Sequence, residues 1–187
     1  MPMQRYTTST LSGICLMLLA WQPVAAIAEV PASEYAVKTA MVYKITKFIS
    51  WPDSAFAFDD SPLNICVAKG SSFAKPIKSL QGREVRGHSI EIVTFKDAGA
   101  IELQCQVLLV SRKEADQAGV LLLAVARKPV LTIGDSEGFA EQGGIIGLEL
   151  EQSRVNFAIN IDASQQVGLG INAQLLQLAK LVQEGGA

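Results

Sequence analysis

Short apolar runs and segments of helical periodicity alternate along the chain from residue 33 onward. Apolar or alternating runs bounded by glycine, proline or charged residues are typical of strands. The pattern predicts strands at residues 63–68, 89–95, 107–110, 130–133, 145–150 and 154–161. Only three polar residues separate the last two strands, which favours an antiparallel hairpin.

Apolar residues recur at helical spacing in four other segments, which predicts helices at 34–50, 73–80, 113–126 and 162–182. Ser33 is the expected N-cap of the first helix, and Pro52 ends it because the residue before a proline disfavours helical angles. The buried face of this helix is expected to carry Val37, Ala40, Met41, Ile45 and Phe48. Its lysines are expected in solvent, namely Lys38, Lys44 and Lys47.

Strands that alternate with helices and then form a hairpin predict an α/β fold. We expect a three-layer sandwich with a mostly parallel sheet, an antiparallel edge hairpin and helices on both faces. In the tail, the helix is expected to start at the N-cap Asp162 and to be broken at Gly168 and Gly170.

The first 28 residues have the parts of a secretory signal peptide. Arg5 supplies the positive charge, residues 11–21 the apolar core, and Ala26 and Ala28 the small residues of a cleavage site. The apolar core is shorter than the about 20 residues of a membrane span. We therefore expect a cleaved signal peptide, residues 1–28, followed by one α/β domain, residues 29–187, with no membrane insertion.

The overall charge bears on which partners the chain as a whole can attract. The chain has a net charge of −2 at pH 7, and processing would remove one basic residue, Arg5, from 16 against 18 acidic residues. A mildly acidic chain has no overall electrostatic attraction for nucleic acid or anionic lipid.

Processing would leave two of the three cysteines, Cys66 and Cys105. Two thiols in a small exported domain usually pair, and a bridge is easy if the strands at 63–68 and 107–110 are neighbours. Such a bridge would stabilise the fold by about 3–4 kcal/mol. Two separate buried thiols are the alternative. Two cysteines and the single His88 fall short of a tetrahedral metal site, so no metal or cofactor is expected.

Residues 134–138, Gly-Asp-Ser-Glu-Gly, match the G-x-S-x-G pattern that presents a serine nucleophile in α/β-hydrolases. A serine needs a positioned base, and the only histidine, His88, precedes Ser136 instead of following it as in the hydrolases. The chymotrypsin-like order, with Asp97 or Asp116 as the third member, would need an all-β fold. We therefore predict a structural turn and no enzymatic activity, with a serine hydrolase as the lesser alternative.

Large aromatic side chains crowd the segment after the first helix, at Trp51, Phe56 and Phe58. They can form a lid over the core or a recognition surface. The lid is favoured because most large aromatic residues are mainly buried.

Seven sequence pieces in order resemble one family. They are K-F-I-S-W-P (Lys47 to Pro52), P-L-N-I-C-V (Pro62 to Val67), L-Q-G-R-E-V-R-G (Leu80 to Gly87), C-Q-V-L-L-V-S (Cys105 to Ser111), P-V-L-T-I-G-D-S-E-G-F-A-E-Q-G-G-I-I (Pro129 to Ile146), N-F-A-I-N-I-D-A (Asn156 to Ala163) and L-L-Q-L-A-K (Leu175 to Lys180). The chain resembles the YfiR family of small exported bacterial proteins over about residues 36–182.

The resemblance implies a periplasmic regulator that binds and inhibits the periplasmic sensor domain of an inner-membrane diguanylate cyclase. Such a protein would lower cyclic di-GMP and biofilm formation. The resemblance also implies that Cys66 and Cys105 form the family's shared disulfide, and that a homodimer is possible through the terminal helix. The family's second cysteine pair is missing, because residues 139–148 contain no cysteine.

The candidate residues for an apolar partner-binding face are Trp51, Phe56 and Phe139. A periplasmic small-ligand binding module is the alternative function. An open turn at residues 70–72, after the first strand, would favour that alternative.

Overall fold

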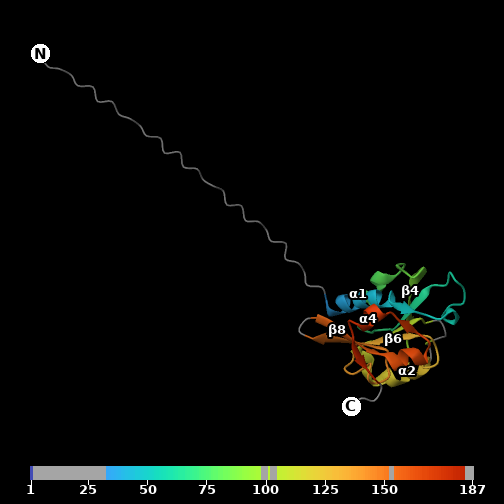
Figure 1. The fold of residues 1–187 in the computed structure, drawn as a ribbon. Coiled ribbons are helices and arrows are strands. Elements are labelled where there is room, and N and C mark those ends of the chain that lie inside the picture. Colours follow the sequence, from blue (N-terminus) through green and yellow to red (C-terminus); the bar gives the residue numbers. More distant parts are fainter. Residues whose placement is uncertain (2–32, 98–100, 102–104, 152–153, 184–187) are drawn as a thin grey trace. The chain divides into compact units, whose positions relative to one another are not determined.

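The computed structural model describes residues 1, 33–97, 101, 105–151 and 154–183 (Figure 1). The predicted signal peptide, apart from Met1, lies outside the described residues. Within them, the helices are α1 (Glu34–Thr46), α2 (Ala118–Val125), α3 (Ile161–Gln166) and α4 (Ala173–Leu176). Three 3-10 helices add to these, η1 (Asp53–Ala55), η2 (Pro76–Leu80) and η4 (Arg112–Gln117).

The described strands fall into two sheets, one of eight strands and one of two. The large sheet has the order β10-β8-β7-β6-β5-β2-β4-β3. Its strands, in chain order, are β2 (Leu63–Ala68), β3 (Glu84–Val85), β4 (His88–Phe95), β5 (Val107–Val110), β6 (Leu131–Gly134), β7 (Ile146–Glu151), β8 (Arg154–Asn160) and β10 (Lys180–Val182). The small sheet pairs β1 (Ile49–Ser50) with β9 (Gly170–Ile171).

Parallel pairing runs from β4 through β2, β5 and β6 to β7, and antiparallel pairing joins β7 to β8. The predicted hairpin is therefore present, but it does not form the edge of the sheet. β10 pairs in parallel with β8 and lies outside it. The tail supplies this extra strand where the sequence predicted helix, so α4 is short and Val182 belongs to a strand.

Helices cover both faces of the large sheet, which confirms the predicted sandwich (Figure 1). Successive residues of a strand point to opposite faces. On β2, Ile65 and Val67 pack with Val42 and Ile45 of α1, whereas Cys66 packs with Leu121 and Val125 of α2. Continuous burial of β2, β5 and β6 is typical of parallel strands with both faces covered.

α1 begins as predicted, because the side chain of Ser33 accepts a hydrogen bond from the backbone N–H of Ala36 at 3.3 Å. It ends four residues before the predicted boundary of Ser50. Ile49 and Ser50 are extended because they pair with Ile171 and Gly170. The start of α3 also differs from the prediction, since the N-cap is Asn160, whose side chain accepts from the N–H of Ala163 at 2.9 Å, and not Asp162.

Two predicted helices are partly 3-10. The segment 73–80 has only η2, and the segment 113–126 divides into η4 and α2. Pro76 stands at the first position of η2, where its missing N–H and fixed φ are tolerated.

Candidate functional site

Three polar turns meet at the carboxyl end of the central parallel strands, after β2, β5 and β6. The chain leaves β2 for β4 on one side and then returns to β5 on the other, which makes this crevice the topological switch point of the sheet. Ligands of open α/β sheets usually bind at such a point. It is therefore the first place to look for a small-molecule site.

The protein's own Glu114 carboxylate occupies this crevice. Its Oε2 accepts hydrogen bonds from the N–H of Ser111 at 2.8 Å, the hydroxyl of Ser111 at 2.6 Å and the hydroxyl of Ser71 at 3.2 Å. The Ser111 hydroxyl also accepts from the N–H of Ser72 at 3.4 Å. These donors, which could bind an anion, are thus already used, so the turn at 70–72 lacks the openness that would have favoured the small-ligand alternative.

Beside this crevice, at the same end of the strands, a buried lysine forms ion pairs with two carboxylates. Lys38 of α1 is fully buried, and its Nζ lies 2.6 Å from Oδ2 of Asp135, which is also fully buried. Nζ also lies 2.5 Å from Oε1 of Glu34, and the backbone N–H of Arg112 donates to Oδ1 of Asp135 at 2.6 Å. The prediction that Lys38 is in solvent is therefore wrong. Its partner stands 97 residues away in the chain, and pairing replaces the hydration that both charges lose.

Two residues that were predicted on the buried face of α1 are instead exposed. Val37 is 40% exposed, and Ala40 is exposed, because the helix turns Lys38, Thr39 and Val42 toward the sheet. Tyr35 lies beside the buried charges and stacks edge-on against Phe73 at 5.0 Å between ring centroids. Burial raises the pKa of Tyr35 above its ordinary value of 10.0, and the nearby Asp135 adds to this.

The two members of the possible nucleophile–base pair are not joined. His88 begins β4, and its Nδ1 lies 2.8 Å from the carbonyl oxygen of Ser61. Ser136 follows β6, and its buried hydroxyl has no hydrogen-bond partner among the described residues. No reaction centre is assembled between them in this structure. Among the described residues, no three His, Cys, Asp or Glu side chains group around a possible metal site.

The opposite end of the strands carries a loop rich in aromatic residues, 51–58, which we call the aromatic loop. Gln106, directly before β5, fixes this loop by hydrogen bonds. Its backbone carbonyl accepts from the indole N–H of Trp51 at 3.2 Å, and its side-chain amide donates to the carbonyl of Ala55 at 2.7 Å. Its side-chain oxygen accepts from the N–H of Asn64 at 2.8 Å, which ties the loop to β2.

The aromatic loop is partly lid and partly exposed surface. Trp51 and Phe56 are half-buried against the core, as the lid interpretation predicted. Phe56 stacks face to face on the ring of His88, with centroids 3.9 Å apart and planes 4° from parallel. Phe58, however, is 74% exposed. A pocket of about 190 Å³ lies beside the stack and includes Trp51 and Arg86 in its lining.

Phe139 does not belong to an exposed face. It is only 1% exposed and packs in the core on the α2 side of the sheet. Glycines make room for its ring, because a Cβ added at Gly134 or Gly144 would overlap the ring atoms of Phe139. The glycine-rich segment therefore serves packing. The prediction of Phe139 as a surface residue is wrong because its ring fills the space that these two glycines leave.

The predicted disulfide between Cys66 and Cys105 is formed, with 5.8 Å between the Cα atoms. β2 and β5 are neighbours, which was the condition for it. Cys105 immediately precedes Gln106, so the covalent link and the aromatic loop's hydrogen bonds arise from consecutive residues.

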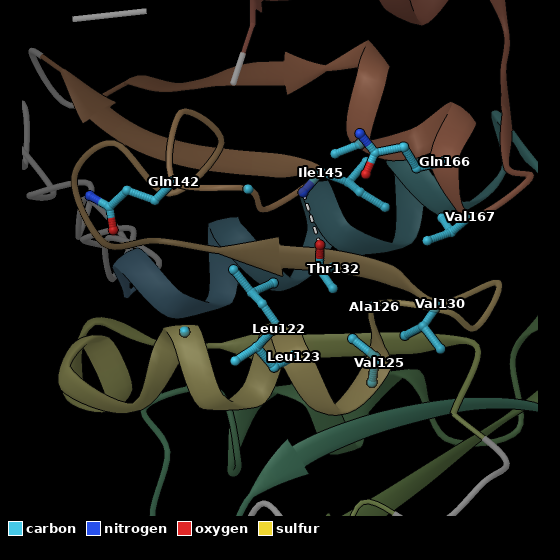
Figure 2. A pocket seen from close by; sticks show the side chains of 13 residues that line it. Leu122, Leu123, Val125, Ala126, Val130, Thr132, Gln142, Ile145, Gln166 and Val167 are labelled. Atoms are coloured by element: carbon cyan, nitrogen blue, oxygen red, sulfur yellow. Dashed lines mark hydrogen bonds between the residues drawn. The ribbon is translucent and has the colours of Figure 1, made fainter. Parts of the chain in front are cut away.

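A further apolar surface lies on α2, which carries Leu122, Leu123 and Val125 in Figure 2. Val120 is 58% and Leu123 is 78% exposed. A pocket of about 320 Å³ opens beside them, between α2 and the segments that carry Gln142 and Gln166. The sequence pattern predicted this segment only as part of a helix, but every residue of 118–125 is apolar or glycine. A helix that is apolar all round must be covered on all sides or present an apolar surface, and that was the available signal.

A model of the family described as YfiR/HmsC-like matches residues 35–180. No curated protein matches the chain by sequence. Among solved structures, a conserved domain protein from Vibrio cholerae O1 biovar El Tor is similar, with a TM-score of 0.54 and 12% identity over 81% of this chain. The ABC domain of Streptococcus pneumoniae in complex with L-Trp is similar with a TM-score of 0.50 and 9% identity over 79% of this chain.

The chain spans 60% of the length of each of these two structures. At such low identity, they support the α/β fold and nothing about ligands. Among the described residues, none of the helices combines the length and the apolar character that crossing a bilayer demands.

Proposed function

Because the chain belongs to the YfiR/HmsC-like family, we propose that it is a periplasmic protein that binds the periplasmic domain of an inner-membrane diguanylate cyclase and holds the enzyme inactive. The family supports a periplasmic regulator of a diguanylate cyclase in general. The binding mode and the direction of control are our proposal. The expected consequence is lower cyclic di-GMP and less biofilm.

The observation that carries this proposal is the aromatic loop. Its exposed end, Phe58, is 74% accessible, whereas its base is fixed by the hydrogen bonds of Gln106 to Trp51 and Ala55. A large apolar side chain on a fixed loop can bind a partner without first losing much conformational entropy. Aromatic residues are also enriched in the energetically important centres of protein interfaces.

We assign the docking surface to Phe58 with Trp51 and Phe56 beside it. The stacked pair of Phe56 and His88 gives this surface a rigid floor. Phe139 is excluded from it by its burial. The assignment keeps two of the three residues that the sequence suggested and adds Phe58, whose exposure the sequence could not show.

A complementation experiment tests the proposal. We expect deletion of the gene to raise cellular cyclic di-GMP and biofilm, and the wild-type gene to reverse both. The variant Phe58→Asp should restore neither fully, because it places a charge in the centre of the docking surface. Leu178→Asp is the matched control, since Leu178 is 76% exposed and lies between α4 and β10, outside the aromatic loop.

Binding is measured separately with purified proteins. The exported protein is titrated with the soluble periplasmic domain of the cyclase that cross-links to it in the envelope. Phe58→Asp should weaken binding at least tenfold, about 1.4 kcal/mol, while Leu178→Asp leaves it unchanged. A deletion that leaves cyclic di-GMP unchanged contradicts the regulatory role, and equal binding by both variants contradicts the assigned surface.

We expect no enzymatic contribution from Ser136. Ser136→Ala should therefore complement as well as the wild type. Loss of regulation in that variant, with unchanged folding, would instead support a role of the hydroxyl in chemistry.

A further inference from the structure

α2 leaves an aliphatic face in solvent that packing does not explain. Val120 and Leu123 are one turn apart, so they lie on the same face of the helix, and they are 58% and 78% exposed. On the opposite face, Leu121 and Val125 are fully packed against the sheet. We call the exposed pair, together with Ala126, the α2 ledge.

The charge around the α2 ledge differs from that of the whole chain. The helix is followed at once by Arg127 and Lys128, and residues 117–128 contain no acidic residue, although the exposed Asp116 directly precedes them. The pocket beside the ledge adds the neutral amides Gln142 and Gln166, as Figure 2 shows, and no carboxylate lines it. This local surface is basic and aliphatic, although the chain as a whole has a net charge of −2.

We infer that the α2 ledge docks on the surface of an anionic phospholipid bilayer, with Val120 and Leu123 entering the boundary between head groups and acyl chains and Arg127 contacting the lipid phosphates. Helices that lie in a membrane interface combine an apolar face with flanking cations. A bilayer needs only apolar area and opposite charge from the protein.

The composition of the ledge favours lipid over a protein partner. It has no aromatic residue, whereas protein interfaces concentrate their binding energy in Trp, Tyr and Arg, and Leu and Val are under-represented there. The aromatic loop, 51–58, already has the composition expected of a protein-binding surface. The two surfaces thus suit two different classes of partner.

Docking of this kind is weak and reversible. Two aliphatic side chains bury less apolar area than one myristoyl chain, whose own association constant is about 10⁴ M⁻¹. The chain's overall negative charge opposes it further. Such binding holds a protein near a membrane and raises its local concentration around a membrane-anchored partner.

The test is sedimentation of the exported protein, purified after processing, with lipid vesicles at millimolar lipid. Vesicles of phosphatidylethanolamine with phosphatidylglycerol should bind it, and vesicles of phosphatidylcholine alone should bind it at least tenfold less. Binding should fall as salt rises, because cations of the protein contact lipid phosphates.

Variants locate the surface. Leu123→Asp and the double variant Arg127→Glu with Lys128→Glu should each reduce vesicle binding at least tenfold. Leu178→Asp, at a similarly exposed leucine outside the ledge, should leave it unchanged. All substituted positions are at least partly exposed, and thermal unfolding of each variant confirms that it folds.

Three results overturn the inference. The first is that the wild-type protein does not sediment with anionic vesicles at low salt. The second is that Leu123→Asp binds these vesicles as well as the wild type does, and the third is that Leu178→Asp loses as much binding as Leu123→Asp. Loss of binding to the soluble cyclase domain in Leu123→Asp, without vesicle binding by the wild type, would make the ledge a protein surface instead. No cyclase is present in the vesicle assay, so its outcome is independent of the proposed regulatory function.

Discussion

At the carboxyl end of the central strands, the protein's own side chains take the hydrogen-bond donors of the turns after β2 and β5, whereas at the amino end a loop of aromatic side chains reaches solvent. Glu114 takes the serine and backbone donors of one turn, and Lys38 neutralises Asp135 of another. At the amino end, Gln106 satisfies the polar groups beneath the loop and leaves Phe58 exposed.

This difference between the two ends indicates which of them can serve as a binding site. In most α/β sheets the carboxyl end binds ligands because its turns offer free N–H groups. Here the donors of the turns after β2 and β5 already have partners within the protein, and these hydrogen bonds stabilise this end of the sheet. Function is then expected at the amino end, where hydrogen bonds fix the backbone and apolar side chains remain free to bind.

The largest expected effect is at the closed end. Lys38→Met leaves the buried carboxylate of Asp135 without its closest cation, and we expect the free energy of unfolding to fall by roughly 3–5 kcal/mol. Denaturant unfolding measures it. Lys44→Met, at an exposed lysine of the same helix, is the matched control and should change stability by less than about 0.5 kcal/mol.

The double variant Lys38→Met with Asp135→Asn refines this result. It removes both charges and should be less destabilised than Lys38→Met alone, because no unpaired charge stays buried. If the charge pair were unimportant, the two effects would simply add.

The disulfide is expected to contribute almost as much. Cys66→Ala with Cys105→Ala opens a loop whose ends are 39 residues apart, and the loss in unfolding free energy should be about 3–4 kcal/mol. Denaturant midpoints of the oxidised, reduced and double-alanine proteins measure it. Reduced and oxidised protein with the same midpoint would contradict the prediction.

At the exposed end, Gln106→Met should cost about 1–3 kcal/mol, because the N–H of Asn64 and the carbonyl of Ala55 lose a buried partner. Trp51 is the only tryptophan after residue 28, so its fluorescence reports directly on the aromatic loop and should shift to the red. The control is Gln81→Met, since the side chain of Gln81 also accepts a backbone hydrogen bond, from Ile92, but in an exposed position. Equal losses at both positions would mean that Gln106 has no special role in the loop.

The smallest effect concerns pH at the closed end. Burial raises the pKa of Tyr35 in the folded protein, so folding favours the protonated phenol. The corresponding stability is fully present below pH 10.0, the ordinary pKa, and is lost as the pH rises from there toward the folded pKa. Tyr35→Phe should therefore lose less stability than the wild type when unfolding is measured between about pH 9 and 11. Equal pH slopes for both proteins would contradict this.

Sequence reasoning succeeded where local pattern decides the structure. The apolar runs at 63–68 and 107–110 became buried parallel strands because burial on both faces requires a continuous apolar run. The disulfide followed once those strands were neighbours. The fold class was therefore accessible from local pattern, whereas the family came from the resemblance of seven sequence pieces.

Sequence reasoning failed where a residue far away in the chain determines whether a side chain is buried or which element forms. The burial of Lys38 depends on Asp135, and the burial of Phe139 depends on two glycines that approach its ring from either side. The tail forms β10 because β8 offers an open edge, which its own helical periodicity does not reveal. Exposure of Phe58 and Leu123 is likewise a result of packing elsewhere in the fold.

The short pairing of β1 with β9 has a consequence for how the protein is made. The residues after α1 are synthesised long before their partners. Ile49 and Ser50 must wait for Gly170 and Ile171, which lie near the carboxyl terminus. Folding of this region therefore cannot finish before the tail is present, and removal of Gly170 and Ile171 would leave β1 without its partner strand.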